Sequence, residues 1–285
     1  MRHIQLRNSD SSLRGSSEVE AVLIIKGDVD AVLKELAGLR SILNYRLEPG
    51  QSKIIHDRYF DTIDRRLRKR GANLRIRELD GSLFVSVKSH TRGTLRGATA
   101  RREIEVPWSK QNLLSLIKDL ELEADLALPE RQFSDADPLA AMEATGLQLV
   151  QDRETRREVR NVSSVRKPDL VLAELAIDRV TYHIGNYNIS IFEVEVEEKA
   201  KGSSSVISDL TKALLQAYQP SLQKWSHGKF VTGLAIQRLL ETEPADNLLG
   251  QDRLKPEALG TIDRALRSTR KSWGQRLVRT LLSHR

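Results

Sequence analysis

Acidic side chains repeat at two-residue spacing in two segments that have the composition of strands. Glu18 and Glu20 open the first segment, and Glu193, Glu195 and Glu197 lie in the last one. Because a strand places residues i and i+2 on one face, each segment carries a line of carboxylates opposite a line of aliphatic residues. Carboxylate oxygens are the ligands that hard divalent cations such as Mg²⁺ and Mn²⁺ prefer. The acidic segments therefore predict a metal site.

Basic side chains lie between these segments and have a similar spacing. Arg75 and Arg77 are two residues apart, and Lys88 follows in the next segment. Guanidinium groups bind phosphate through two parallel hydrogen bonds, and a metal ion binds phosphate oxygens at the same time. The chemistry indicated is hydrolysis or cyclisation of a phosphoanhydride, in which positioning and charge neutralisation lower the barrier.

An alternative is that each charged face simply points to water, as in many antiparallel sheets. Two features favour an interior position. The charges are sorted by sign from strand to strand, although like charges on neighbouring strands repel. Amphipathic helices also need an apolar sheet face to cover.

Hydrophobic spacing predicts both strands and helices. The predicted strands are 18–26, 53–60, 72–79, 83–89, 101–107, 154–162, 170–180 and 189–198. The predicted helices are 29–40, 110–121, 204–218 and 229–242. Asp80-Gly81 is typical of a hairpin turn between two of the strands.

These elements predict an α+β protein that is mainly β. Eight strands suit a closed antiparallel barrel that encloses one ligand, with the helices packed outside. We expect a disordered tail at 1–17, the main domain at 18–242, a linker at 243–260 and a basic amphipathic helix at 261–285. That last helix is expected to dock on the barrel or to pair with a second copy as a homodimer; an anionic lipid surface is the alternative partner.

Composition narrows the class of partner. The chain of 285 residues has a net charge of +7, no cysteine and only 5% aromatic residues. The basic balance favours an anionic ligand, but the scarcity of aromatic residues argues against stacking on nucleic acid bases. The absence of cysteine excludes thiol chemistry, and no apolar run predicts a membrane span. We expect a cytoplasmic protein that binds a small polyanion and no specific nucleic acid.

Five segments give the chain a resemblance to a known family. They are EVEAV, YFDTIDRRLRKRGANLRIRELDGSLFVSVKS, RREIEV, LVLAELAIDRV and FEVEVEEKAKG, in this order. Over about 18–242 the chain resembles the CYTH, or triphosphate tunnel metalloenzyme, family. The resemblance implies an eight-stranded barrel, the tunnel, with the charged faces inside.

The resemblance also implies roles for individual residues. The implied metal ligands are Glu18, Glu20, Glu193 and Glu195. The implied substrate-binding residues are Arg75, Arg77, Lys88, Arg101, Arg156 and Lys224, and the implied catalytic residues are Lys88, Arg156, Asp178 and Lys224. Arg157 is a rival of Arg156, because a slip of one residue exchanges the two faces of a strand. Glu174, Glu197, Glu103 and Glu105 share these faces and are secondary candidates.

Two positions depart from the family pattern. Val22 stands where the opening motif Glu-x-Glu-x-Lys has lysine, and His227 stands where arginine is usual. We expect a triphosphatase that uses Mg²⁺ or Mn²⁺ to hydrolyse tripolyphosphate or a nucleoside or thiamine triphosphate. A class IV type of adenylate cyclase, which makes cyclic AMP from ATP, is one alternative. A non-catalytic binder of triphosphate or polyphosphate is the other, and the two departures motivate it.

Overall fold

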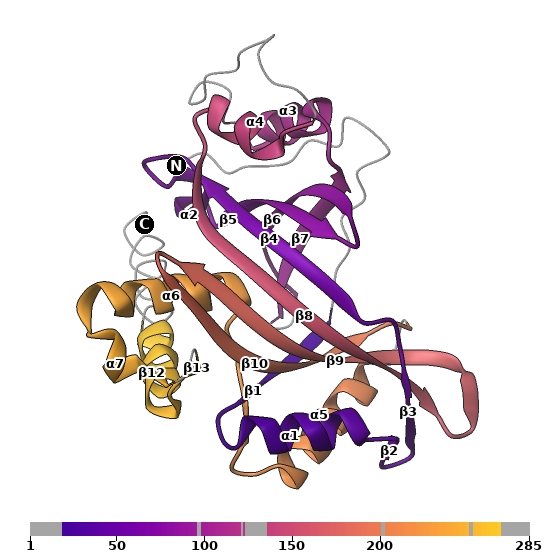
Figure 1. The fold of residues 1–285 in the computed structure, drawn as a ribbon. Helices are drawn as coiled ribbons and strands as arrows, with labels where there is room; N and C mark the ends of the chain where they lie inside the picture. The colour runs from indigo at the N-terminus through magenta and orange to yellow at the C-terminus, as the bar shows by residue number, and fades with distance from the viewer. Residues whose placement is uncertain are drawn as a thin grey trace, which may run out of the picture. The chain divides into compact units, whose positions relative to one another are not determined.

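The computed structural model describes residues 19–95, 98–120, 122, 136–200, 203–250 and 253–268. Over residues 89–95 and 98–102 it describes the backbone alone. The chain divides into two compact units (Figure 1). Among the described residues, the first unit is 53–154, and the second combines 19–52 with the residues from 155 onward.

The first unit is an antiparallel sheet with helices. Its elements are β4 (Lys53–Asp61), α2 (Arg66–Lys69), β5 (Ala72–Leu79), β6 (Ser82–Leu95), β7 (Ala98–Pro107), α3 (Lys110–Asp119), α4 (Pro138–Ala144) and the first part of β8 (Gln148–Ser164). The strand order is β8-β4-β5-β6-β7. Asp80 and Gly81 both have positive φ, 49° and 77°, which confirms the predicted hairpin turn between β5 and β6.

Alternation along these strands separates an apolar face from a charged face. Leu74, Ile76 and Val87 point to the apolar face, which packs against Leu113 and Ile117 of α3. Ser109 caps α3, because its side chain accepts a hydrogen bond from the amide of Asn112. The face on the other side of β5 carries Arg75 and Arg77.

The second unit is also built on an antiparallel sheet. Its elements are β1 (Glu20–Ile25), α1 (Val29–Gly38), β2 (Ser41–Ile42), β3 (Tyr45–Pro49), the rest of β8, β9 (Lys167–Ile184), β10 (Tyr187–Glu198), α5 (Ser204–Ala217), β11 (Leu222–Lys224), α6 (Lys229–Thr242), α7 (Ala245–Leu248), β12 (Leu249–Gly250), β13 (Arg253–Leu254) and a helix over 256–268. The strand order is β11-β1-β10-β9-β8, and β3 pairs with the end of β8.

The two faces of this second sheet have different coverings. One face presents Leu23, Leu175 and Val194 to helices α1 and α5 (Figure 1). The opposite face is acidic along part of its length. Where that face is apolar, Tyr182 and Ile191 pack against α6, α7 and the helix at 256–268.

The mainly β, α+β class is confirmed, but a closed barrel is not. In the part of the chain that the structure describes, the strand order runs from β11 to β7 without returning on itself, so closure stays a prediction. The segment 243–260, which we expected to be a linker, carries α7, β12, β13 and the start of a helix, and its Leu248 and Leu259 are buried. The apolar residues of that segment pack into a core formed with residues that are distant in sequence. The local composition of the segment does not reveal this packing.

The expected tail at 1–17, Glu18 and the end of the C-terminal helix from 269 onward lie outside the described residues. None of the helices within the described ranges is both long and apolar enough to cross a lipid bilayer.

Candidate functional site

Three carboxylates gather on the acidic face of the second unit. Glu193 and Glu195 lie on β10, and Asp178 lies directly opposite Glu193 on β9. Asp178 and Glu193 are fully buried. Two neighbouring strands thus bring three like charges together, which is unfavourable unless cations compensate for them. We call Asp178, Glu193 and Glu195 the acidic cluster.

Two cations enter the acidic cluster. The Lys229 ammonium lies 3.1 Å from Oδ2 of Asp178 and 3.0 Å from Oε2 of Glu193, and it also donates to Glu195. The Arg157 guanidinium donates from Nε to Oδ1 of Asp178 at 2.8 Å and from Nη2 to Oδ2 at 2.6 Å, and it also donates to Glu195. Both cations therefore hold the carboxylates in defined orientations.

The position of Lys229 follows from the start of helix α6. Gly228 precedes the helix in extended conformation, and Lys229 is its first residue. The Tyr182 hydroxyl donates a hydrogen bond of 2.8 Å to the backbone carbonyl of Lys229. The strand β9 thus fixes the helix end that delivers the ammonium.

Burial and neighbouring charges shift the pKa values of Glu193 and Glu195 in opposite directions. Burial raises the pKa of Glu193 to about 7, and the nearby Lys229 only partly offsets that rise. For Glu195 burial acts in the same direction, but Lys229 and Arg157 outweigh it and lower the pKa to about 2. The pKa of Lys229 is raised well above its usual value, because the surrounding carboxylates outweigh the effect of burial.

Glu193 has unused capacity to bind a cation. Its Oε2 is within ion-pair distance of Lys229, yet neither carboxylate oxygen accepts a hydrogen bond of good geometry from the described residues. Buried carboxylate oxygens of this kind suit Mg²⁺ or Mn²⁺, which take oxygen ligands. The acidic cluster therefore offers oxygen donors of the chemical type that the metal predicted from the sequence prefers, with the Lys229 ammonium lying among them.

Glu20 and Glu197 extend the same face toward solvent. They are directly opposite each other on β1 and β10, and Glu20 is exposed. Lys199 lies 2.9 Å from Glu197 and 3.6 Å from Glu174. Of the predicted metal ligands, the structure thus brings Glu193 and Glu195 into one cluster and places Glu20 further along β1.

Three of the predicted phosphate-binding residues, Arg75, Arg77 and Lys88, lie together in the first unit. Arg75 is buried and donates to Glu103 at 2.8 Å and to Glu105 at 3.1 Å. Arg77 donates to both carboxylate oxygens of Asp57, at 2.8 and 3.1 Å. Lys88 is 2.7 Å from Glu103. Each of these three cations has a carboxylate partner, and a phosphate would have to compete with it.

Asp57 is the centre of this basic group, and the sequence did not single it out. It is fully buried next to Arg75, Arg77 and Arg153. Burial alone would raise the pKa of Asp57, but the guanidinium groups of Arg75, Arg153 and Arg77 hold it well below its usual range. The Tyr59 hydroxyl accepts a hydrogen bond of 3.1 Å from Arg153 and one of 3.3 Å from Arg75, which completes the network.

The remaining predicted residues have different positions. Arg156 is exposed on β8, whereas its rival Arg157 contacts Asp178, so the structure brings the rival position to the acidic cluster. The physical reason is the register of β8, which a pair of adjacent arginines leaves open. The backbone of Arg101 pairs with that of His90, and its side chain lies outside the described part. Lys224 is exposed on β11, opposite Leu23 of β1.

The two departures from the family pattern also have clear positions. Val22 is directly opposite Glu195 in the β1–β10 pair. His227 is buried, lies 2.8 Å from Asp263 and contacts the ring of Trp225 edge-on. His227 therefore connects the helix at 256–268 to the segment that leads into α6.

Sequence reasoning missed Lys229 as well as Asp57. The only local signal for Lys229 was its place after Ser226-His227-Gly228, where a helix begins. Two-residue alternation detects charges on strands, so it cannot detect a cation that a helix delivers from 34 residues beyond Glu195.

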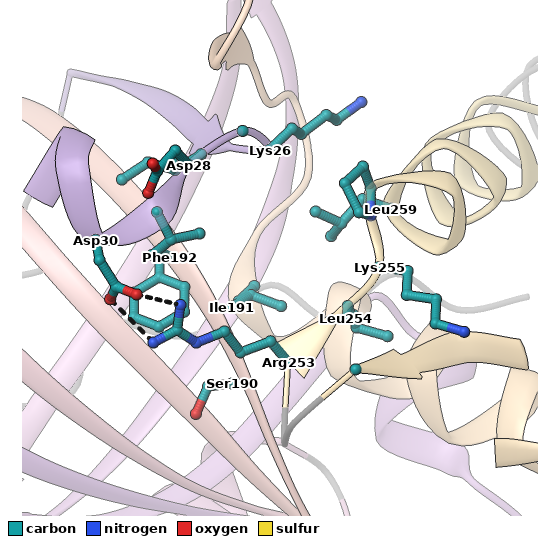
Figure 2. Close-up of a pocket in the computed structure, with 15 residues that line it drawn as sticks. Lys26, Asp28, Asp30, Ser190, Ile191, Phe192, Arg253, Leu254, Lys255 and Leu259 are labelled. Atoms are coloured by element: carbon teal, nitrogen blue, oxygen red, sulfur yellow. Dashed lines mark hydrogen bonds and ion pairs between the residues drawn. The ribbon is translucent and has the colours of Figure 1, made fainter. Parts of the chain in front are cut away.

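A separate cavity of about 340 Å³ lies in the second unit (Figure 2). It is bordered by the start of α1, by β10 and by residues 253–259. Arg253 donates two hydrogen bonds to Asp30, at 3.0 and 3.1 Å, and its guanidinium lies over the ring of Phe192. None of the predicted site residues lines this cavity.

Comparison with known proteins assigns the family. The family model of the CYTH domain matches residues 17–227, so the chain belongs to the CYTH domain family. The search of curated proteins gives no match. A solved structure from Hippeastrum, of a protein assigned as an adenylyl cyclase and described as having a dominant triphosphatase activity, is 17% identical and covers 80% of this chain and 98% of its own, with a TM-score of 0.47. An assigned adenylate cyclase from Bacillus halodurans is 20% identical and covers 75% and 95%, with a TM-score of 0.45.

Proposed function

We propose that this protein is a metal-dependent triphosphatase that hydrolyses the terminal phosphoanhydride of an inorganic or organic triphosphate. The observation that carries the proposal is the acidic cluster, in which the fully buried Glu193 has Lys229 as an ion-pair partner but accepts no hydrogen bond of good geometry from the described residues. Membership of the CYTH family supports the substrate class.

In this proposal the acidic residues hold the metal. Glu193, Glu195 and Asp178 would bind Mg²⁺ or Mn²⁺, with Glu18 and Glu20 as further ligands. A bound metal ion would withdraw charge from phosphate oxygens and make the phosphorus easier to attack. Arg157 and Lys229 keep the carboxylates oriented, because each contacts at least two of them.

The basic residues of the first unit bind phosphate oxygens. Arg75, Arg77 and Lys88 exchange carboxylate partners for phosphate, which offers equivalent acceptor oxygens. Asp57 stays in place and keeps Arg75 and Arg77 extended from β5. Arg101 is proposed as a further contact to the substrate. Lys224 is directly opposite Leu23, whose side chain faces α1 and α5, so the register of β11 places it on the other side of the sheet from the acidic cluster.

The test is phosphate release from tripolyphosphate, ATP and thiamine triphosphate, each with Mg²⁺ or Mn²⁺. We expect release that EDTA abolishes and that added metal restores. The Glu195→Gln variant should lose about 10- to 100-fold in rate, because it removes one proposed ligand charge. The exposed Glu78→Gln is the matched control and should keep the full rate.

The alternatives are outcomes of the same experiment. Formation of cyclic AMP from ATP would show that the protein is an adenylate cyclase and not a triphosphatase. Triphosphate binding without any product would favour a non-catalytic binder. A specific observation supports that second candidate: Arg157 and Lys229 already neutralise much of the acidic cluster, and Val22 occupies the position of the usual lysine.

A further inference from the structure

Position 22 faces the acidic cluster but carries no charge. Val22 on β1 is directly opposite Glu195 on β10. In an antiparallel pair the Cβ atoms of such residues are about 4.5–5.5 Å apart, so a lysine at position 22 would reach the Glu195 carboxylate. Val22 instead packs against the apolar cluster that contains Trp225 and Ile236.

The cation that contacts Glu195 comes from a different element. Lys229 extends from the first turn of α6, and its side chain is only 12% exposed. Its ammonium is within ion-pair distance of all three carboxylates of the acidic cluster. Arg157 contacts Asp178 and Glu195, but within the described residues it forms no ion pair with Glu193. Lys229 is therefore the group that joins Glu193 to the other two.

The two positions are also connected through the backbone. The amide of Trp225, four residues before Lys229, donates a hydrogen bond of 2.9 Å to the carbonyl of Val22. The strand β11 pairs with β1 just beyond this point. The segment that leads into α6 is thus anchored to the same stretch of β1 that carries the uncharged position.

We propose that Lys229 supplies, from helix α6, the ammonium that position 22 of β1 lacks. It acts as a positioning residue: it holds Glu193 and Glu195 in the orientation that binds the metal, and it lets β1 use position 22 for apolar packing. The inference rests on the proposed function for its catalytic consequence, but not for its structural one.

A double-mutant cycle of four proteins tests whether a lysine at position 22 can take over the role of Lys229. It compares the wild type with Lys229→Met, Val22→Lys and the double variant that carries both changes. Thermal unfolding is followed by circular dichroism, and phosphate release from tripolyphosphate is measured with Mn²⁺. The exposed Lys34→Met on α1 is the matched control for loss of a lysine, and it should change neither quantity.

We expect Lys229→Met to lower the unfolding temperature by roughly 5 °C or more, because three buried carboxylates lose their shared cation. It should also lower the rate of phosphate release by about 10- to 100-fold. Adding Val22→Lys should recover more than half of both losses. Val22→Lys alone should lower the unfolding temperature, because a second ammonium then crowds the same carboxylates.

The stability cycle separates this inference from the proposed function. If the wild type releases no phosphate, the triphosphatase proposal fails, yet recovery of the unfolding temperature in the double variant still supports the role of Lys229. If the double variant is as unstable as Lys229→Met, or if neither folds, the two lysine positions are not equivalent and the inference is overturned.

Discussion

Asp57 shows how much a single buried carboxylate organises in the first unit. It has ion pairs with Arg75, Arg77 and Arg153, and it is almost completely inaccessible to solvent. Transfer of such charges from water is costly, so the network is favourable only while every member has its partners. Its value for function is geometric, since it fixes where two proposed phosphate-binding side chains point.

The Asp57→Asn variant tests this dependence. We expect it to lower the free energy of unfolding by about 3–5 kcal/mol, because three guanidinium groups lose their common counter-charge in a buried place. Urea denaturation measures the change. Glu78→Gln, at an exposed position near the end of the neighbouring strand β5, should stay within about 0.5 kcal/mol of the wild type. A loss for Asp57→Asn no larger than this control would contradict the prediction.

Glu193 gives the second residue-scale prediction, which concerns pH. Its pKa rises from 4.5 to about 7 in the folded protein, chiefly through burial. Between these two values the folded state binds a proton that the unfolded state has released. The free energy of unfolding therefore falls as pH rises through this window, by up to about 3 kcal/mol for this group. Above the window it no longer changes with pH through Glu193.

The Glu193→Gln variant removes the titrating group and keeps its shape. We expect its free energy of unfolding to rise relative to the wild type as pH increases from about 4.5 to about 7, because only the wild type then has to bury a charge. Urea denaturation at several pH values, in the presence of EDTA, gives the difference between the two proteins. Parallel profiles would show that Glu193 ionises normally in the folded state.

At the scale of elements, strand β10 serves two purposes at once. Its even positions, including Val194 and Val196, join the core under α1 and α5, and its odd positions carry the glutamates. The helix α5 packs on the apolar side through Leu210 and Leu214, which are fully buried. The acidic cluster therefore depends on apolar contacts made on the opposite face of the same sheet.

The Leu210→Ala variant tests that support. We expect a loss of about 2–5 kcal/mol in the free energy of unfolding, since it leaves a cavity between α5 and the sheet. The exposed Lys212→Ala in the same helix should change it by less than about 0.5 kcal/mol. Chemical denaturation of both variants measures the two free energies of unfolding. Equal stability of the two variants would show that α5 does not support the sheet.

At the scale of the whole molecule, the helix at 256–268 is part of the core of the second unit. Ile262 is fully buried in the cluster that contains Trp225 and Tyr182, although both are far from it in sequence. The His227–Asp263 contact adds a polar connection next to it. Residues after the matched family region at 17–227 thus contribute to the core of that region.

Removal of one such contact should destabilise the second unit. We expect Ile262→Ala to cost about 2–5 kcal/mol, because the side chain is buried in a packed cluster. The exposed Arg264→Ala in the same helix is the control, with an expected change below about 0.5 kcal/mol. Thermal unfolding of both variants measures the difference. A wild-type unfolding temperature for Ile262→Ala would mean that this helix is dispensable for stability.

The sequence alone determined the features that depend on local periodicity. Alternation predicted β1 and the strands from β4 to β10, but it missed the shorter β2, β3, β11, β12 and β13. It also gave the faces of Glu193, Glu195, Arg75 and Arg77, because neighbours in a strand point in opposite directions whatever surrounds them. The Asp80-Gly81 turn was predictable for a similar reason, since its backbone conformation favours these residues. The CYTH motifs then indicated the family, which the family model confirms.

Only the tertiary structure decided which partners meet. The choice of Arg157 over Arg156 depends on the register of β8, and the choice of Lys229 depends on where α6 begins. Asp57 became significant only when three arginines from two other strands surrounded it. Such contacts join residues that are distant in the chain, and their energies depend on burial and on neighbouring charges, which local sequence does not contain.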